Sequence, residues 1–224
     1  MNISFIEFLA KNGAMRFGEF TLKSGRASPY FIDIGCLTSG NTVSDLGRYY
    51  ASRIHECFGD RFDVIFGPAY KAIPIAISAA IELKYLHRMD KRWLFDRKEM
   101  KLHGADANSV FVGSQNLDHG ARVVIVDDVI TTGGTKVEAI EKLQKTLKAE
   151  IAGIVIAVDR KEMGKRAGAL EEFTEQTGVP VHPIVDIHAV FNHLRNKPVD
   201  GKVYVDDKLH AKYKDYMAKY GVKS

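Results

Sequence analysis

The spacing of hydrophobic residues changes along this chain. Apolar residues between Ile3 and Leu9 predict a short N-terminal helix. Residues 17–22 and 30–34 are typical of short strands on either side of a turn-rich segment. From Asn41 onward apolar residues recur at close to helical spacing, which predicts a longer helix. The first part of the chain therefore predicts a small mixed unit of helices and short strands.

Further along, apolar runs alternate with helical patterns. The runs that predict strands occupy residues 62–66, 122–126, 151–158 and 179–184. Helices are predicted between them, over residues 73–83, 133–148 and 165–177. Continuous apolar strands that alternate with helices predict a mainly parallel sheet flanked by helices on both faces. Ligands bind such sheets beyond the carboxyl ends of the strands, so the loops after Phe66, Val126 and Val158 are expected to carry chemistry.

Composition narrows the classes of protein that fit. With 224 residues, 46% hydrophobic and 27% charged, the chain fits one globular domain over residues 1–224. A net charge of +4 suits phosphate-bearing ligands as well as nucleic acid and does not choose between them. Two cysteines without a Cys-x-x-Cys spacing argue against a disulfide framework or a structural zinc site. Because no signal peptide or bilayer-spanning run is evident, a cytoplasmic location is expected.

The strongest candidate for chemistry is the segment V-V-I-V-D-D-V-I-T-T-G-G-T at residues 123–135. An apolar strand delivers Asp127 and Asp128 to the edge of the sheet, where carboxylates can accept hydrogen bonds from sugar hydroxyls or magnesium-bound water. The glycines that follow allow backbone N–H groups to surround a phosphate, and the next helix points its N-terminus there. An ordinary strand–turn–helix connection is the plainer alternative.

This segment resembles the phosphoribosyl-diphosphate (PRPP) binding motif of the type I phosphoribosyltransferases. Three further segments are similar to the orotate phosphoribosyltransferase family: F-T-L-K-S-G-R-A-S-P-Y-F at 20–31, G-P-A-Y-K-A-I-P at 67–74 and F-D-R-K-E-M-K-L-H-G at 95–104. The four segments extend over about residues 17–160 in the order of that family. The resemblance implies the type I phosphoribosyltransferase fold, a central mainly parallel sheet flanked by helices. It also implies a small hood from about residues 1–40 and the C-terminal part, and a mobile catalytic loop at about 97–109.

The resemblance also implies an activity. Such an enzyme is a pentosyltransferase that moves ribose 5-phosphate from PRPP to orotate, giving orotidine 5′-monophosphate (OMP) and diphosphate in pyrimidine biosynthesis. Mg²⁺ is the implied cofactor. A cytoplasmic homodimer with shared active sites is expected, with the loop reaching the neighbouring subunit, and neither nucleic acid nor membrane is expected as a partner.

Residue roles follow from the same resemblance. Catalytic roles are expected for Lys101, His103, Asp127 and Asp128. PRPP is expected to contact Lys23, Tyr70, Lys71, Arg97, Lys98, Lys101, His103, Asp127, Asp128, Val129, Ile130, Thr131, Thr132, Gly133, Gly134 and Thr135. Orotate is expected to contact Phe31, Ile32, Thr131 and Arg160, with the guanidinium on the carboxylate. No direct metal ligand is assigned, although Asp127 and Asp128 could hold Mg²⁺ through water.

Without the resemblance, several of these residues also fit plainer roles. Arg160 could form a surface salt bridge with Asp159 or Glu162, and residues 31–32 could belong to the core. The cations of residues 97–103 could form a solvated charge run. These alternatives remain open on the sequence alone.

Two other functions compete with the one implied. The first is a phosphoribosyltransferase for a different base, because the aspartate loop is shared across the superfamily. Residues 23–31 and 97–103 argue against it. The second is a PRPP-sensing regulator that binds nucleic acid, but the basic residues are dispersed and the stretch before Phe17 is short for a DNA-binding unit.

Overall fold

The computed structural model describes residues 2–22, 25–99, 110–115, 117–130 and 133–223. Its centre is a six-stranded sheet whose strands lie in the order β5, β4, β3, β6, β7, β8. The strands are β3 (Val64–Phe66), β4 (Arg92–Asp96), β5 (Phe111–Val112), β6 (Arg122–Asp127), β7 (Glu150–Asp159) and β8 (Val181–Asp186). All neighbours pair in parallel except β4 and β5. The mainly parallel sheet predicted from the sequence is confirmed.

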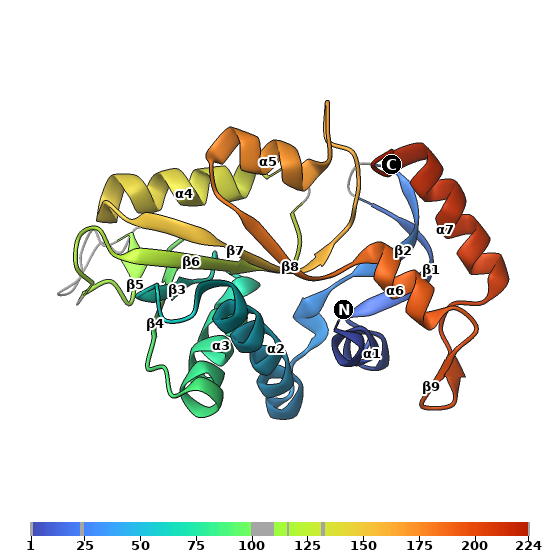
Figure 1. Cartoon of the computed structure of the whole chain (residues 1–224), viewed down its shortest axis with the longest axis horizontal. Helices are drawn as coiled ribbons and strands as arrows, with labels where there is room; N and C mark the ends of the chain where they lie inside the picture. The colour runs from blue at the N-terminus through green and yellow to red at the C-terminus, as the bar shows by residue number, and fades with distance from the viewer. Residues whose placement is uncertain (1, 23–24, 100–109, 116, 131–132, 224) are drawn as a thin grey trace.

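Helices cover both faces of this sheet (Figure 1). One face carries α2 (Gly40–Phe58) and α3 (Ala72–His87), and the other carries α4 (Gly134–Leu147) and α5 (Ala169–Thr177). Side chains of β6 alternate between them: Val124 and Val126 belong to one buried cluster, and Val123 and Ile125 to the other. The continuous apolar run of β6 is therefore explained by burial on both faces.

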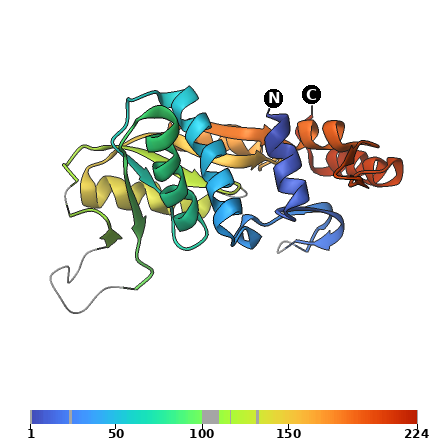
Figure 2. The ribbon, with the colours of Figure 1, turned by 90° about the horizontal axis from the view of Figure 1, so that it is seen from below.

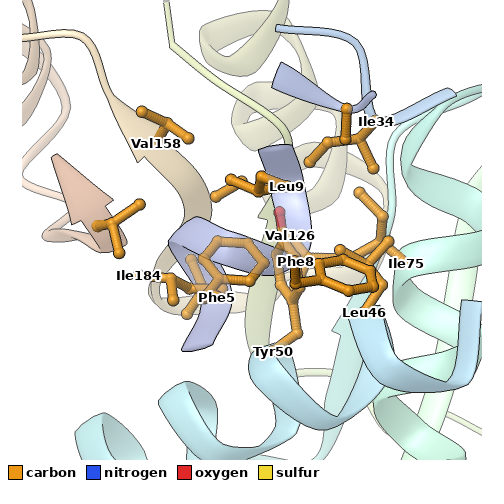
Figure 3. Close-up of a cluster of buried hydrophobic side chains, with 14 of the residues drawn as sticks. Phe5, Phe8, Leu9, Ile34, Leu46, Tyr50, Ile75, Val126, Val158 and Ile184 are labelled. Carbon is orange, nitrogen blue, oxygen red and sulfur yellow. The ribbon is translucent and has the colours of Figure 1, made fainter. Parts of the chain in front are cut away.

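The larger buried cluster extends from the sheet to the N-terminal helix α1 (Ile3–Lys11). Figure 3 shows Phe5, Phe8 and Leu9 of α1 beside Tyr50 of α2 and Val126 of β6. Phe5 and Tyr50 are fully buried. Packing of α1 against the same cluster as β6 fixes the N-terminal part of the chain relative to the sheet.

A second group of elements lies at the β8 end of the sheet (Figures 1 and 2). It contains the antiparallel pair β1 (Met15–Thr21) and β2 (Ala27–Ile32), and a short 3₁₀ helix, η1 (Ile34–Cys36). The C-terminal part adds α6 (Ile187–Leu194), the short strands β9 (Pro198–Val199) and β10 (Lys202–Val203), and α7 (Asp207–Tyr220). The rings of Tyr30 in β2 and Tyr216 in α7 lie 6.0 Å apart, centroid to centroid. The two ends of the chain thus pack together over the edge of the sheet.

One predicted helix begins later than its apolar pattern suggested. The structure places α5 at Ala169–Thr177, because the preceding residues bond to a side chain instead of continuing the helix. Backbone N–H groups of Lys165, Arg166 and Ala167 donate to the Glu172 carboxylate. These three hydrogen bonds lower the pKa of Glu172 to about 2, and the bond from Lys165 has the largest effect.

Within the described residues, no helix combines the length and apolar character needed to cross a bilayer.

Candidate active site

Two adjacent carboxylates lie at the carboxyl end of β6, in the middle of the sheet. Asp127 Oδ1 accepts a hydrogen bond from the backbone N–H of Asp128 at 2.8 Å, and Asp128 Oδ1 accepts one from Val129 at 2.7 Å. The Tyr50 hydroxyl donates to the Asp127 carbonyl oxygen at 2.7 Å. Side-chain-to-backbone bonds of this kind favour a turn over further strand. The chain therefore leaves the sheet at the point where both acids are held.

Each of these carboxylates faces a lysine. The Lys136 ammonium, in the first turns of α4, lies 2.6 Å from Asp127 Oδ2, and both side chains are largely buried. Lys71, which precedes α3, lies 3.9 Å from Asp128 Oδ2 and 2.9 Å from Asp33 Oδ1. Burial and the nearby charge of Asp127 raise the pKa of Asp128. The hydrogen bond from Lys71 lowers the pKa of Asp33. The result is a cluster of alternating charges at the sheet edge.

The N-terminus of α4 opens beside this cluster. Gly133 has a φ of +73°, and a Cβ on it would lie 2.7 Å from the Phe173 ring, so a larger residue does not fit. Gly134 and Thr135 are exposed at the start of the helix. Free N–H groups at a helix N-terminus attract anions. Thr131 and Thr132 lie outside the described residues.

The loop between β3 and α3 approaches from the neighbouring strand. A Cβ on Gly67 would lie 2.3 Å from the Ala72 carbonyl oxygen, so the loop turns more tightly than another residue permits. Asp96, at the end of β4, accepts a hydrogen bond from the Ala69 N–H at 2.8 Å and pairs with Lys142 of α4 at 3.3 Å. Asp96 thereby ties the loop to α4. Lys71 belongs to this loop, and so does Tyr70, whose side chain is strongly exposed.

The described part of the cationic segment extends from the end of β4. The Arg97 N–H donates to the Val110 carbonyl oxygen at 2.9 Å, and Lys98 is exposed. Lys101 and His103 lie outside the described residues, as does Lys23 of the N-terminal segment. Their predicted roles stay predictions.

A small cavity of about 50 Å³ lies next to the carboxylates, between β2 and the end of β7. It is lined by Leu22, Tyr30, Phe31, Ile32, Val129 and Arg160. Three of the four residues predicted for orotate thus surround one cavity. Val129 also follows Asp128 directly, so the cavity and the charge cluster adjoin. Arg160 forms a salt bridge with Glu162 at 2.7 Å, but the pair is largely buried, unlike the surface salt bridge of the plainer alternative.

Some residues of this site were missed from the sequence. Asp33 follows β2 directly, just as Asp127 ends β6. An acidic residue at the end of a strand was the sequence signal that could have indicated Asp33. Lys136 lies two residues into α4, where its side chain turns back toward the helix N-terminus. Asp96 gave no comparable signal, because its partners Ala69 and Lys142 lie far away in the sequence. Glu162 was anticipated only as one of two alternative salt-bridge partners of Arg160.

Comparison with known proteins supports one family. Residues 36–183 match the family model described as phosphoribosyl transferase domain. The chain is 41% identical over 221 residues to orotate phosphoribosyltransferase of Agathobacter rectalis, covering 98% of this chain and 97% of that protein. It is 40% identical over 220 residues to the enzyme of the same name from Acinetobacter baylyi, covering 98% and 95%. The crystal structure of orotate phosphoribosyltransferase from Francisella tularensis superposes with a TM-score of 0.79 at 35% identity, covering 97% and 99%.

Proposed function

This chain belongs to the orotate phosphoribosyltransferase family, and on that premise we propose that the site described above transfers ribose 5-phosphate from PRPP to orotate. The products are OMP and diphosphate, in a step of pyrimidine biosynthesis. The observation that carries the proposal is the charge cluster of Asp127, Asp128 and Lys71 beside the cavity that contains Arg160. The charge cluster suits the polyanionic sugar PRPP, and the cavity suits the planar carboxylic acid orotate.

The charge cluster would bind PRPP. The N-terminus of α4, with Gly133, Gly134 and Thr135, suits the 5-phosphate. The residues that link the cluster to α4, Val129 and Ile130, would present backbone groups to the same ligand. Asp127 and Asp128 would accept hydrogen bonds from the ribose hydroxyls. Tyr70 and Lys71 would contact the diphosphate from the β3 loop.

Bond cleavage then needs charge placement more than a protein nucleophile. The bond between ribose C1 and the diphosphate oxygen breaks, and its electron pair leaves with the diphosphate. A ring nitrogen of orotate forms the new bond to C1 and loses its proton. Carboxylates near C1 stabilise positive charge that develops on the sugar, and lysine stabilises the negative charge on the leaving group. Lys101 and His103 are proposed to assist that departure.

Magnesium fits this site only as a companion of the substrate. Among the described residues, no three side chains of the metal-binding types form a cluster. Asp127 Oδ2 already faces Lys136, and Asp128 Oδ1 accepts a backbone hydrogen bond. Mg²⁺ commonly keeps several waters and binds through substrate phosphates, so Asp127 and Asp128 would hold it through water. When bound, the ion would neutralise charge on the diphosphate.

The cavity would bind orotate. The Arg160 guanidinium can clamp a carboxylate with two parallel hydrogen bonds. Phe31 and Ile32 line the wall of the cavity and would contact the ring. Thr131 is proposed to contact orotate from the phosphate loop.

A homodimer is proposed through the outward face of α3. Ile81 and Tyr85 lie one helical turn apart with exposed fractions of 49% and 76%, and Tyr70 before the helix is 70% exposed. Large apolar side chains aligned on one face mark an interaction surface. Because Tyr70 adjoins Lys71, a second copy seated on this face would stand beside the site. The segment 97–109, with Arg97 and Lys98, is proposed to reach across to that copy.

The compartment and the range of partners follow from the same family. We propose a cytoplasmic enzyme, consistent with free thiols at Cys36 and Cys57. Its partners are proposed to be orotate, PRPP and a second copy of the chain, without nucleic acid or membrane.

The proposal is tested by following orotate through its ultraviolet absorbance with purified protein, PRPP and Mg²⁺. Orotate should disappear only when both PRPP and Mg²⁺ are present, and Lys101→Ala should slow its loss strongly. Loss of another base in place of orotate, under the same conditions, would assign the site to a different phosphoribosyltransferase.

A further inference from the structure

Arg160 is held by a network of side chains behind the cavity. Its Nη2 lies 2.7 Å from Glu162 Oε1, and both side chains are only 13% exposed. Two phenols bridge the pair. The Tyr30 hydroxyl accepts from Arg160 Nε at 3.3 Å and donates to Glu162 Oε1 at 3.1 Å. The Tyr216 hydroxyl accepts from Arg160 Nη2 at 3.5 Å and donates to the same oxygen at 2.7 Å.

These contacts fix the direction of the guanidinium. They engage Nε and Nη2 of the guanidinium. Among the described residues no side chain bonds Nη1, so this end of the guanidinium can donate to a carboxylate in the cavity. A planar guanidinium held in one orientation loses little freedom when it binds such a ligand.

Helix α7 supplies part of this network through its backbone as well. The Met163 N–H donates to the Tyr220 carbonyl oxygen at 2.8 Å, and the Val222 N–H donates to the Lys161 carbonyl oxygen at 2.9 Å. These bonds flank Glu162 on both sides. The C-terminal end of α7 thus forms one unit with the segment that carries Glu162.

A second arginine balances the charge of Glu162. Arg26 Nη1 lies 3.7 Å from Glu162 Oε2, and the Arg26 guanidinium lies 4.8 Å from the Tyr220 ring centroid. When a substrate carboxylate pairs with Arg160, Glu162 therefore keeps a cation beside its other oxygen. Without Arg26, two carboxylates would share one guanidinium in a largely buried place, which is costly.

We propose that Glu162 is a positioning residue that aims Arg160 at the carboxylate of the pyrimidine, with Tyr216 of α7 holding it and Arg26 as its counter-ion. Helix α7 would then set the preference for pyrimidines that carry a carboxylate. This inference rests on the proposed function and extends it beyond the residues that contact the substrate.

The test compares two nucleotides that differ only in that group. OMP carries the carboxylate and uridine 5′-monophosphate (UMP) lacks it, so titration calorimetry with each measures the contribution of Arg160. In Tyr216→Phe we expect the Kd for OMP to rise about tenfold, the size of one lost hydrogen bond to a charged group, with the Kd for UMP changed less than about twofold. Tyr213→Phe is the matched control, because it removes a buried hydroxyl of α7 that bonds to His188 instead. It should leave both constants unchanged.

A pair of variants at Glu162 completes the test. Glu162→Gln keeps an oxygen that accepts from the phenols, so it should weaken OMP binding less than Glu162→Ala does. Equal weakening of OMP and UMP in Tyr216→Phe would show a merely structural role and overturn the inference. A wild-type protein that binds OMP no more tightly than UMP would instead overturn the proposed function, so the two failures are distinguishable.

Discussion

At the scale of single residues, the proposed function of Asp128 uses an ionised carboxylate, whereas folding favours the protonated form. Burial and the charge of Asp127 raise its pKa, so its ionised form is disfavoured in the folded protein. A carboxyl group with a raised folded pKa stabilises the fold below its unfolded pKa, and that contribution is lost as pH rises through the folded pKa. Near neutral pH, therefore, ionisation of this carboxyl group lowers the stability of the folded protein.

Asp128→Asn should stabilise the folded protein and reduce its activity. We expect a Tm increase that is larger at pH 8 than at pH 4, because only the ionised carboxyl is penalised, together with a fall in kcat of about 100-fold. Thermal unfolding at the two pH values and steady-state rates provide the measurements. Asp215→Asn, at an exposed site on α7, should change neither. A Tm increase of equal size at both pH values would contradict the stated cause.

Lys136→Gln tests the partner of Asp127. Removal of the ammonium leaves a largely buried carboxylate without its cation, so the free energy of unfolding should fall by about 3 kcal/mol. Lys145→Gln lies on the exposed side of the same helix and should change it by less than about 0.5 kcal/mol. Urea denaturation of both variants gives the comparison. Similar losses in the two would show that the pair with Asp127 contributes little.

At the scale of elements, features formed by one continuous stretch of sequence could be predicted, whereas contacts between distant stretches could not. The strand β6, its two acids and the start of α4 form one continuous string, and the structure places them together as predicted. The strand β4 was missed because Leu94 is its only fully buried residue, and β5 has two residues. The Asp33–Lys71 pair depends on loop paths that no local pattern reveals, and so do the bonds from Tyr30 and Tyr216 to Glu162.

Packing of α2 on α3 gives a prediction at this scale. A Cβ on Gly47 would lie 2.7 Å from the backbone carbonyl of Ser78, so the two helices could not keep their distance. Gly47→Ala should lower the free energy of unfolding by about 2 kcal/mol through overpacking. Gly40→Ala, at the open start of α2, should cause no loss. Chemical denaturation measures both, and an unchanged Gly47→Ala would show that the helices can separate freely.

At the scale of the whole molecule, the apolar face of α3 predicts assembly. The protein should elute at twice the 25.0 kDa of one chain, and Tyr85→Glu should shift it to one chain by placing a charge in the interface. Val203→Glu changes another exposed apolar residue, in β10, and should leave the mass unchanged. Light scattering after size-exclusion chromatography measures both variants. A dimer that survives Tyr85→Glu would place the interface elsewhere.

Sharing of the site between copies can be tested by mixing two inactive variants. If segment 97–109 acts in the neighbouring subunit, Lys101→Ala and Asp128→Ala chains should regain part of the activity when combined, because a mixed dimer contains one intact site. The rate after mixing is compared with that of each variant alone. No recovery, with mixed dimers shown by mass spectrometry, would mean that each chain completes its own site.

The bonds from α7 to the segment around Glu162 also bear on how the protein can be handled as a reagent. Tyr220 and Val222 are joined to Met163 and Lys161 through the backbone, so a purification tag or surface linker appended after α7 would pull on the segment that carries Glu162. The exposed turn at residues 200–201 makes no such connection to the cavity. An immobilised orotate sensor built on this protein is therefore better anchored through that turn.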